Sequence, residues 1–198
     1  MGHVFTPPLD RLVEFCASEL DIDVFVETGT FRGESAAWAA SRFRRVITIE
    51  ASSLLHEQAR SAATAPNIEF LCGESEDLFG DLLAKVREPK LVWLDAHWCG
   101  DGAPTAAGQD RQCPLLKELE ALTLSPSDDV ILIDDFHMFA VPPPVPFHFD
   151  QWPDVEAIFR SMQQLRSDRK VFIYHNVLVV AFGRHAVPLQ HFFRDAQF

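Results

Sequence analysis

Apolar runs of three to six residues alternate along the chain with longer amphipathic stretches. The runs predict strands over 24–26, 46–49, 68–71, 91–94 and 130–133. The stretches between them predict helices over 9–20, 35–43, 53–65, 77–86 and 114–122. Short apolar strands separated by helices are typical of a parallel sheet that is covered on both faces. The pattern therefore predicts a doubly wound α/β fold.

The last third of the chain departs from this alternation. The stretch 140–153 holds five prolines among aromatic residues, which predicts a loop rather than a helix or strand. A helix over 154–166 follows, with Asp154 as its cap. The apolar runs 171–174 and 177–182 predict a C-terminal β-hairpin, which brings the mostly parallel sheet to seven strands.

Length and charge narrow the class of protein. The 198 residues suffice for one domain, which we expect to span 1–198 with an N-terminal helix inside 1–22. The 17 basic and 29 acidic residues give a net charge of -12, which disfavours nucleic acid as a partner. The chain lacks an apolar run of the roughly 18 residues that a membrane span needs, and it lacks a signal-peptide pattern. We therefore expect a cytoplasmic protein that binds no membrane, and the sequence leaves a homo-oligomer open.

Residues directly after the apolar runs are the candidates for ligand binding, because open α/β sheets bind ligands at the carboxyl ends of their strands. The first run leads into a turn in which Gly29 and Gly33 allow close approach of the backbone to a ligand. The second run ends in Glu50, whose carboxylate can accept hydrogen bonds from both hydroxyls of a ribose. Together these features favour an adenosine-containing ligand.

Here the sequence resembles the class I S-adenosylmethionine (SAM)-dependent methyltransferases, whose first motif is an acidic residue followed by a glycine turn, as in the segment 27–33. The resemblance implies a Rossmann-like fold with SAM as the cofactor. It also implies that Glu27 and the turn lie near the methionine part, Glu50 beside the ribose, and Glu74 with Ser75 beside the adenine. The implied cofactor-binding residues are Glu27, Thr28, Gly29, Thr30, Gly33, Glu50, Ala51, Gly73, Glu74, Ser75 and Asp95.

Carboxylates also follow the fourth and fifth strands. Asp95 and His97 come after the fourth strand, and Asp134 with Asp135 comes after the fifth. If the two strands are neighbours, these carboxylates converge at one edge of the sheet. Three converging carboxylates repel one another unless a hard divalent cation such as Mg²⁺ binds between them. The pattern predicts a magnesium site at Asp95, Asp134 and Asp135, although the last two could also be a solvated strand end.

This arrangement is similar to that of the macrocin-type and cephalosporin hydroxylase-like metal-dependent O-methyltransferases. The resemblance implies that the metal orients the acceptor hydroxyls and lowers their pKa, while a nearby base takes the proton. His97 is the candidate base and Asp95 its catalytic partner. The segments 98–112 and 139–153 are the candidate active-site loops over a small-molecule acceptor such as a sugar, a macrolide or another natural product.

Two other classes of function fit the same residues. A fold of this type can bind an adenosine ligand or a protein partner without transferring a methyl group, because fold does not dictate function. The acidic cluster could also serve a metal-dependent hydrolase. The first alternative predicts no need for a divalent ion, and the second predicts turnover without a methyl donor.

Overall fold

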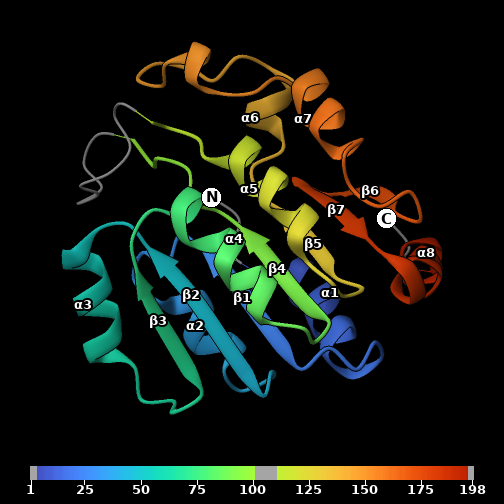
Figure 1. Ribbon diagram of the computed structural model, residues 1–198, viewed down its shortest axis with the longest axis horizontal. Helices are drawn as coiled ribbons and strands as arrows, with labels where there is room; N and C mark the ends of the chain where they lie inside the picture. Colours follow the sequence, from blue (N-terminus) through green and yellow to red (C-terminus); the bar gives the residue numbers. More distant parts are fainter. Residues whose placement is uncertain (1–3, 101–110, 196–198) are drawn as a thin grey trace.

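The computed structural model describes residues 4–100 and 111–195. One seven-stranded sheet crosses it in the order β3-β2-β1-β4-β5-β7-β6 (Figure 1). Its strands are β1 (Val24–Thr28), β2 (Arg45–Glu50), β3 (Ile68–Cys72), β4 (Lys90–Leu94), β5 (Val130–Ile133), β6 (Lys170–Tyr174) and β7 (Val177–Ala181). The helices are α1 (Leu9–Ser18), α2 (Glu34–Ala39), α3 (Ser53–Ala62), α4 (Ser75–Lys85), α5 (Leu115–Ala121), α6 (His137–Ala140), α7 (Val155–Met162) and α8 (Ala186–Asp195).

The strand pairing has the topology that the sequence predicts. β1 pairs in parallel with both β2 and β4, so the direction in which the chain adds strands reverses there. β7 pairs antiparallel with β5 and with β6, which completes the C-terminal hairpin. Ligands of doubly wound sheets bind in the crevice at such a reversal, outside the carboxyl ends of the strands. The predicted fold class, a doubly wound and mostly parallel seven-stranded sheet with a C-terminal hairpin, is confirmed.

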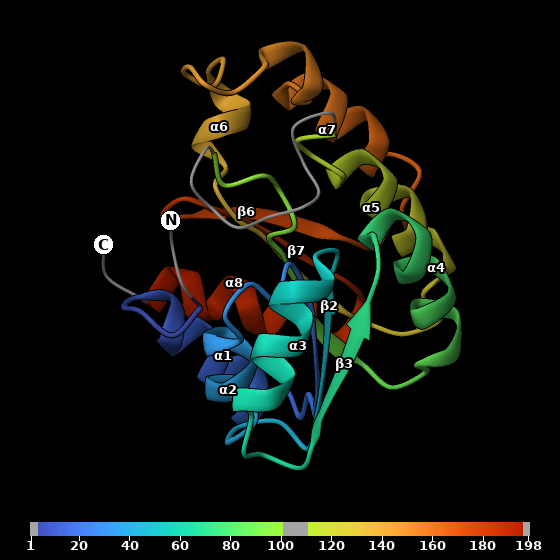
Figure 2. The same ribbon diagram turned by 90° about the vertical axis from the view of Figure 1, so that its left-hand side faces the viewer.

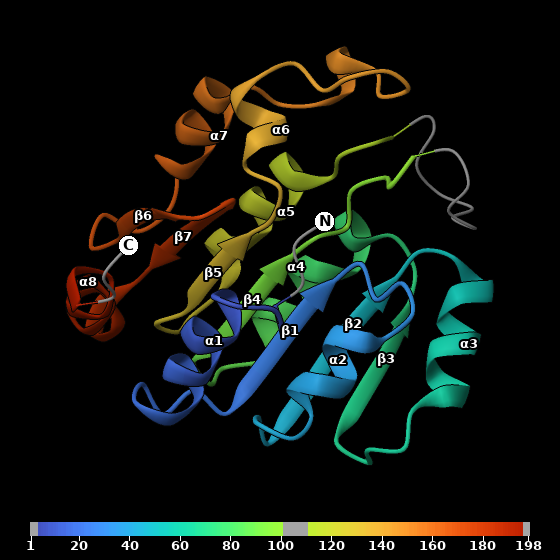
Figure 3. The ribbon, with the colours of Figure 1, turned by 180° about the vertical axis from the view of Figure 1, so that it is seen from behind.

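Two hydrophobic cores lie on opposite faces of the sheet, because successive side chains of a strand point to opposite sides. In β1, Phe25 packs with α1, α2 and α8, whereas Val24 and Val26 pack with α4, α5 and α7. Figure 2 shows α1, α2 and α8 on one side of the sheet and α4, α5 and α7 on the other, and Figure 3 shows the first group from behind. Within the described residues, none of the helices is both long and apolar enough to span a membrane.

The structure differs from the sequence expectation mainly at helix ends and after the hairpin. The helix expected over 35–43 ends at Ala39, and the one expected over 154–166 ends at Met162. The Asp154 cap is confirmed, since its carboxylate accepts a 2.7 Å hydrogen bond from the Ala157 amide. Helices α6 and α8 were not expected. The four residues of α6 are too few to show helical periodicity in the sequence.

A buried ion pair anchors the amino end of β4, far from the crevice. The Lys90 ammonium lies 3.0 Å from Asp129 Oδ1 and 3.1 Å from Oδ2, and both side chains are almost fully buried. The hydroxyls of Ser125 and Ser127 lie 2.9 and 2.7 Å from the same nitrogen. Burial lowers the pKa of Lys90, and Asp129 opposes this effect. With the Glu88 carbonyl oxygen at 3.3 Å, the buried ammonium thus has five oxygen contacts.

We expect Asp129→Ala to destabilise the fold by about 3–5 kcal/mol, because it leaves a buried ammonium without its counter-charge. Urea unfolding of the native and variant proteins measures this loss. The matched control is Glu57→Ala, which removes an exposed carboxylate from α3 and should leave the urea midpoint unchanged. A loss below about 1 kcal/mol for Asp129→Ala would show that the pair adds little to stability.

Candidate active site

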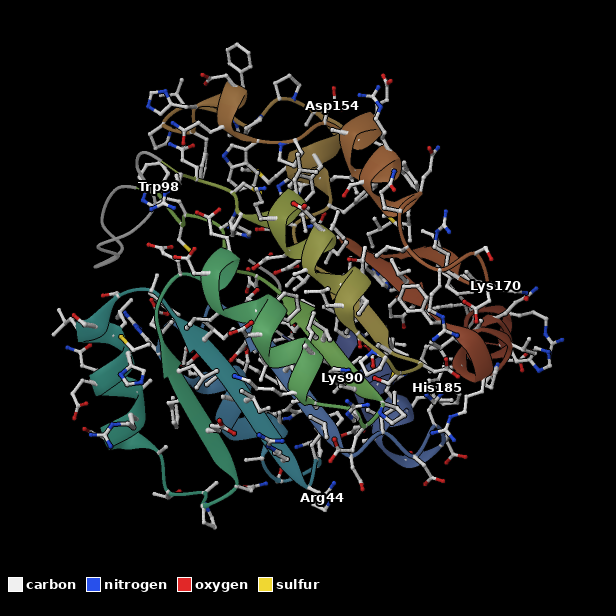
Figure 4. The ribbon with its side chains drawn as sticks, viewed as in Figure 1. Arg44, Lys90, Trp98, Asp154, Lys170 and His185 are labelled. Carbon is white, nitrogen blue, oxygen red and sulfur yellow. The ribbon has the colours of Figure 1, made fainter. Side chains whose placement is uncertain are left out.

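A cavity of about 250 Å³ lies at the carboxyl ends of β1, β2, β3 and β4. Most of the residues predicted to bind a cofactor line it, namely Gly29, Thr30, Glu50, Ala51, Gly73, Glu74, Ser75 and Asp95, and His97 lines it as well. Trp98 also lines the cavity, and Figure 4 shows it above the carboxyl ends of the strands. Lys90 lies at the opposite, amino end of β4. The topological reversal and the cavity therefore coincide.

The glycine turn brings the backbone of β1 against the end of β4. A Cβ atom at Gly29 would lie 2.3 Å from the carbonyl oxygen of Asp95, so only glycine fits there. Gly29 also has a φ of 87°, in the left-handed region. Gly33 has a φ of 76° directly before α2, and a Cβ there would meet the Ala59 side chain at 3.2 Å. Gly33 thus shapes the turn from beneath and does not line the cavity.

Glu50 is held in one orientation at the end of β2. Its Oε2 accepts a 2.8 Å hydrogen bond from the Phe31 amide, and its Oε1 accepts a 2.9 Å bond from the Ser52 amide. Burial raises the pKa of Glu50, and these two bonds oppose the shift. Each carboxylate oxygen can still accept a further hydrogen bond. Two oxygens fixed side by side at the cavity wall suit a pair of vicinal hydroxyls.

Glu27 and Thr28, at the end of β1, are fully buried beneath the cavity rather than in its wall. Burial raises the pKa of Glu27 to about 8. The Thr48 hydroxyl donates to Glu27 Oε2 at 2.8 Å, and the hydroxyls of Thr48 and Thr30 lie 2.5 Å apart. Since Thr48 uses its proton on Glu27, Thr30 donates to Thr48. Glu27 therefore supports the turn at Thr30 through a buried chain of hydrogen bonds.

His97 joins the ends of β4 and β5. Its Nε2 lies 3.1 Å from Asp95 Oδ1 and 3.3 Å from Asp135 Oδ2. Carboxylates only accept hydrogen bonds, so this arrangement favours a proton on Nε2. Nδ1 lies 3.4 Å from the Trp98 carbonyl oxygen, which also only accepts, so these surroundings favour the charged imidazolium. Burial alone would lower the pKa of His97, but Asp135 and Asp95 outweigh it and raise the pKa well above 6.5. Conversely, burial alone would raise the pKa of Asp135, but His97 outweighs it and lowers the pKa.

Asp134 lies beside this group and is 1% exposed. Burial, and then the charges of Asp95 and Asp135, raise its pKa, and neither of its oxygens has a hydrogen-bond partner among the described residues. The three aspartates thus gather as predicted. However, His97 Nε2 already contacts both Asp95 and Asp135, and the described residues contain no group of three His, Cys, Asp or Glu side chains suited to a metal. The magnesium prediction is not supported by this arrangement.

Asn176, in the turn between β6 and β7, is a site residue that sequence reasoning missed. Its Nδ2 donates a 3.0 Å hydrogen bond to Asp135 Oδ1, the oxygen that does not face His97. Its Oδ1 accepts a 2.9 Å bond from the His137 amide. The hairpin therefore fixes the carboxylate of Asp135. The backbone of Asp135 lies in the left-handed region, with a φ of 50°. Asn176 lies 41 positions beyond Asp135, and the sequence carries no signal for so distant a contact.

Aromatic side chains from the predicted loop 139–153 cover His97. The Trp152 ring lies 5.3 Å from the imidazole, centroid to centroid, and the Phe147 ring lies 5.5 Å from the rings of both Trp152 and Trp98. The Gln112 side chain accepts hydrogen bonds from the Trp152 indole at 3.1 Å and from the His148 amide at 2.8 Å. Gln112 is a second residue that the sequence did not predict as part of the site. The loop therefore packs against His97. Of the other predicted loop, 98–112, residues 101–110 lie outside the described residues.

Several known structures share this fold at low sequence identity. An O-methyltransferase from Bacillus cereus in complex with SAH is 19% identical, with 92% of this chain and 84% of that chain covered and a TM-score of 0.63. The O-methyltransferase TomG from Streptomyces achromogenes, involved in tomaymycin synthesis and in complex with SAM, is 19% identical, with 89% and 80% covered and a TM-score of 0.58. An rRNA methylase from Streptococcus thermophilus is 15% identical, with 89% and 96% covered and a TM-score of 0.52.

These similarities establish the fold as that of the class I methyltransferases. No protein-family model matches the sequence, and no curated protein is similar to it. The macrocin-type subfamily therefore stays a prediction, as do the roles of the individual site residues.

We expect the imidazole of His97 to titrate above pH 6.5, because Asp135 and Asp95 stabilise its charged form. Asp135→Asn removes one of these charges and should lower the midpoint. Two-dimensional NMR of the histidine side chains measures both values. Glu69→Gln, which changes an exposed carboxylate on β3, is the control and should leave the midpoint unchanged. A native midpoint at or below 6.5 would contradict this electrostatic account.

Proposed function

We propose that the protein is a SAM-dependent O-methyltransferase that acts on a small hydroxylated acceptor. The observation that carries the proposal is the position of His97 in the wall of the cavity that Gly29 and Glu50 also line. The proposed donor site and the histidine beside Asp95 and Asp135 thus share one cavity. The cofactor-bound O-methyltransferases of the same fold support the donor assignment.

We place the donor in the cavity in the order that the resemblance implies. The turn at Gly29 and Thr30 receives the methionine part, and Glu50 with Ala51 receives the ribose. Gly73, Glu74 and Ser75 receive the adenine. The charge of the wall is consistent with this ligand, because Glu34, Glu50, Glu74, Glu76 and Asp95 outnumber Arg32 and Arg111, and SAM carries a positively charged sulfonium.

Methyl transfer needs alignment and one proton transfer. The acceptor oxygen attacks the methyl carbon, and the new C–O bond forms as the C–S bond breaks, so that the sulfur keeps the electron pair and S-adenosylhomocysteine (SAH) leaves. The hydroxyl proton passes to His97 in its neutral form, whose share increases as the pH rises toward the raised pKa of this residue. Asp95 and Asp135 stabilise the imidazolium that results. This step uses no metal ion, so EDTA should leave the rate unchanged, and a rate that falls with EDTA would favour the predicted magnesium site at Asp95, Asp134 and Asp135.

The surroundings of His97 limit the acceptor. The Trp152 ring lies next to the histidine, and the Phe147 ring contacts the rings of both Trp152 and Trp98. A flat or apolar molecule packs against such rings with little ordering cost. A macrolide or another natural product with a flat or apolar face meets this description, and a sugar meets it only through the C–H groups on one face of its ring. An rRNA methylase shares the fold, but the net charge of -12 disfavours a polyanionic acceptor.

The donor site is tested with Glu50→Ala. This variant removes the two oxygens that would bind the ribose hydroxyls, and we expect it to weaken SAH binding about tenfold or more, since hydrogen bonds to a charged group are worth about 1.5–3 kcal/mol. Isothermal titration calorimetry gives the dissociation constants. Glu57→Ala, on the exposed side of α3, is the control and should bind SAH like the native protein. Equal affinity of Glu50→Ala and native protein would contradict the ribose assignment.

The role of His97 is tested with His97→Gln. A panel of hydroxylated aromatic and sugar acceptors, assayed by SAH release, first identifies an acceptor. With that acceptor, we expect His97→Gln to lower kcat about 100-fold or more, because a positioned base typically contributes that factor. The affinity for SAH should stay within about threefold. SAH binding without turnover on any acceptor would favour the binding-module alternative, and turnover without SAM would favour the hydrolase.

A further inference from the structure

Glu118 of α5 is a buried carboxyl group directly beneath the candidate donor cavity, and it is 2% exposed. Thr28 points toward it, because the two-residue period of β1 puts Thr28 on the same face as Val24 and Val26, which pack with α5. Ser75, the first residue of α4, lies beside it as well. The hydroxyls of Ser75 and Thr28 both stabilise the charged form of Glu118. Figure 1 shows α4 and α5 side by side over the sheet.

The hydrogen bonding of Glu118 is incomplete. Its Oε1 and the Thr28 Oγ1 have no well-aligned hydrogen-bond partner among the described residues. Burial raises the pKa of Glu118 to about 7, and the hydroxyls of Ser75 and Thr28 only partly oppose the shift. A buried polar group that is not fully satisfied lowers stability. The other buried side chains of this helix, Leu115 and Leu119, are apolar, so Glu118 is the charged member of its buried face.

The two partners of Glu118 border the cavity from different elements. Ser75 lines the cavity at the start of α4, and Thr28 directly precedes Gly29, which lines it at the end of β1. The Glu118 carboxyl faces the hydroxyls of both Ser75 and Thr28. It therefore connects the proposed adenine side of the cavity with the turn that follows β1 on the proposed methionine side. Its loss would free the start of α4 to move relative to β1. Residues that lower stability in this way are common where a binding site must be held in place.

We propose that Glu118 is a positioning residue for the methyl donor, which faces Ser75 and Thr28 and so keeps the adenosine part of the cavity in shape. This inference rests on the proposed function, because it needs SAM or SAH as the ligand. Glu118 does not line the cavity itself, so it acts through its two neighbours.

The first test compares Glu118→Leu with Glu118→Gln. We expect Glu118→Leu to weaken the binding of both SAH and adenosine at least tenfold in calorimetry, with a ligand-free melting temperature equal to or above that of the native protein. Glu118→Gln keeps a polar group that can face both hydroxyls, and it should bind SAH within threefold of the native protein. A residue that only supports the core would change the melting temperature rather than the affinity.

The second test uses Thr28→Val, which keeps the shape of the side chain and removes its hydroxyl. We expect Thr28→Val to weaken SAH binding at least threefold, and the double variant with Glu118→Leu to bind no more weakly than Glu118→Leu alone, because the two residues act as one unit. This variant also serves if Glu118→Leu does not fold. Glu57→Gln on α3 is the control for a change of charge.

Three results would overturn the proposal: Glu118→Leu binding SAH within threefold of the native protein, Glu118→Gln losing as much affinity as Glu118→Leu, or Thr28→Val binding SAH like the native protein. A native protein that binds no SAH would instead refute the proposed function itself, so the two failures are distinguishable.

Discussion

The close approach of two strand ends determines the geometry of the whole site. Gly29 packs so tightly on the end of β4 that a Cβ atom would lie 2.3 Å from the Asp95 carbonyl oxygen. This contact fixes the turn after β1, which carries the candidate donor site, directly beside Asp95 and His97. Because β1 pairs with β2 on its other side, Glu50 is placed in the same cavity. One backbone contact therefore sets the distance between the proposed donor and the proposed base.

Charge in this region is balanced by a histidine. Asp95 and Asp135 lie on either side of the His97 imidazole, which supplies the positive charge that the sequence alone suggested a metal would supply. Asp134 and Glu27, buried nearby without such a partner, have raised pKa values instead. Repulsion among the converging carboxylates is thus relieved in two ways. The His97 imidazolium is shared by Asp95 and Asp135, and the raised pKa values of Asp134 and Glu27 favour their neutral forms. The same arrangement makes His97 a stronger base than a solvated histidine.

The sequence predicted the sheet, the hairpin and most of the cavity wall, because strand periodicity and strand-end residues are local signals. It did not predict Asn176, Gln112 or Glu118, which reach the site from distant segments through contacts that only the folded chain brings together. It also assigned Glu27, Thr28 and Gly33 to cofactor binding, whereas they lie beneath the cavity and support it. The order of residues along a motif does not show which of them face the ligand, since that depends on the twist of the turn.

The most direct test of the account is a crystal structure of the protein with SAH. We expect the ribose hydroxyls within hydrogen-bonding distance of Glu50, the homocysteine part over the turn at Gly29, and the adenine beside Ser75. The sulfur atom should then face the side of the cavity on which His97 lies. SAH bound elsewhere, or in the cavity with its ribose away from Glu50, would contradict the account.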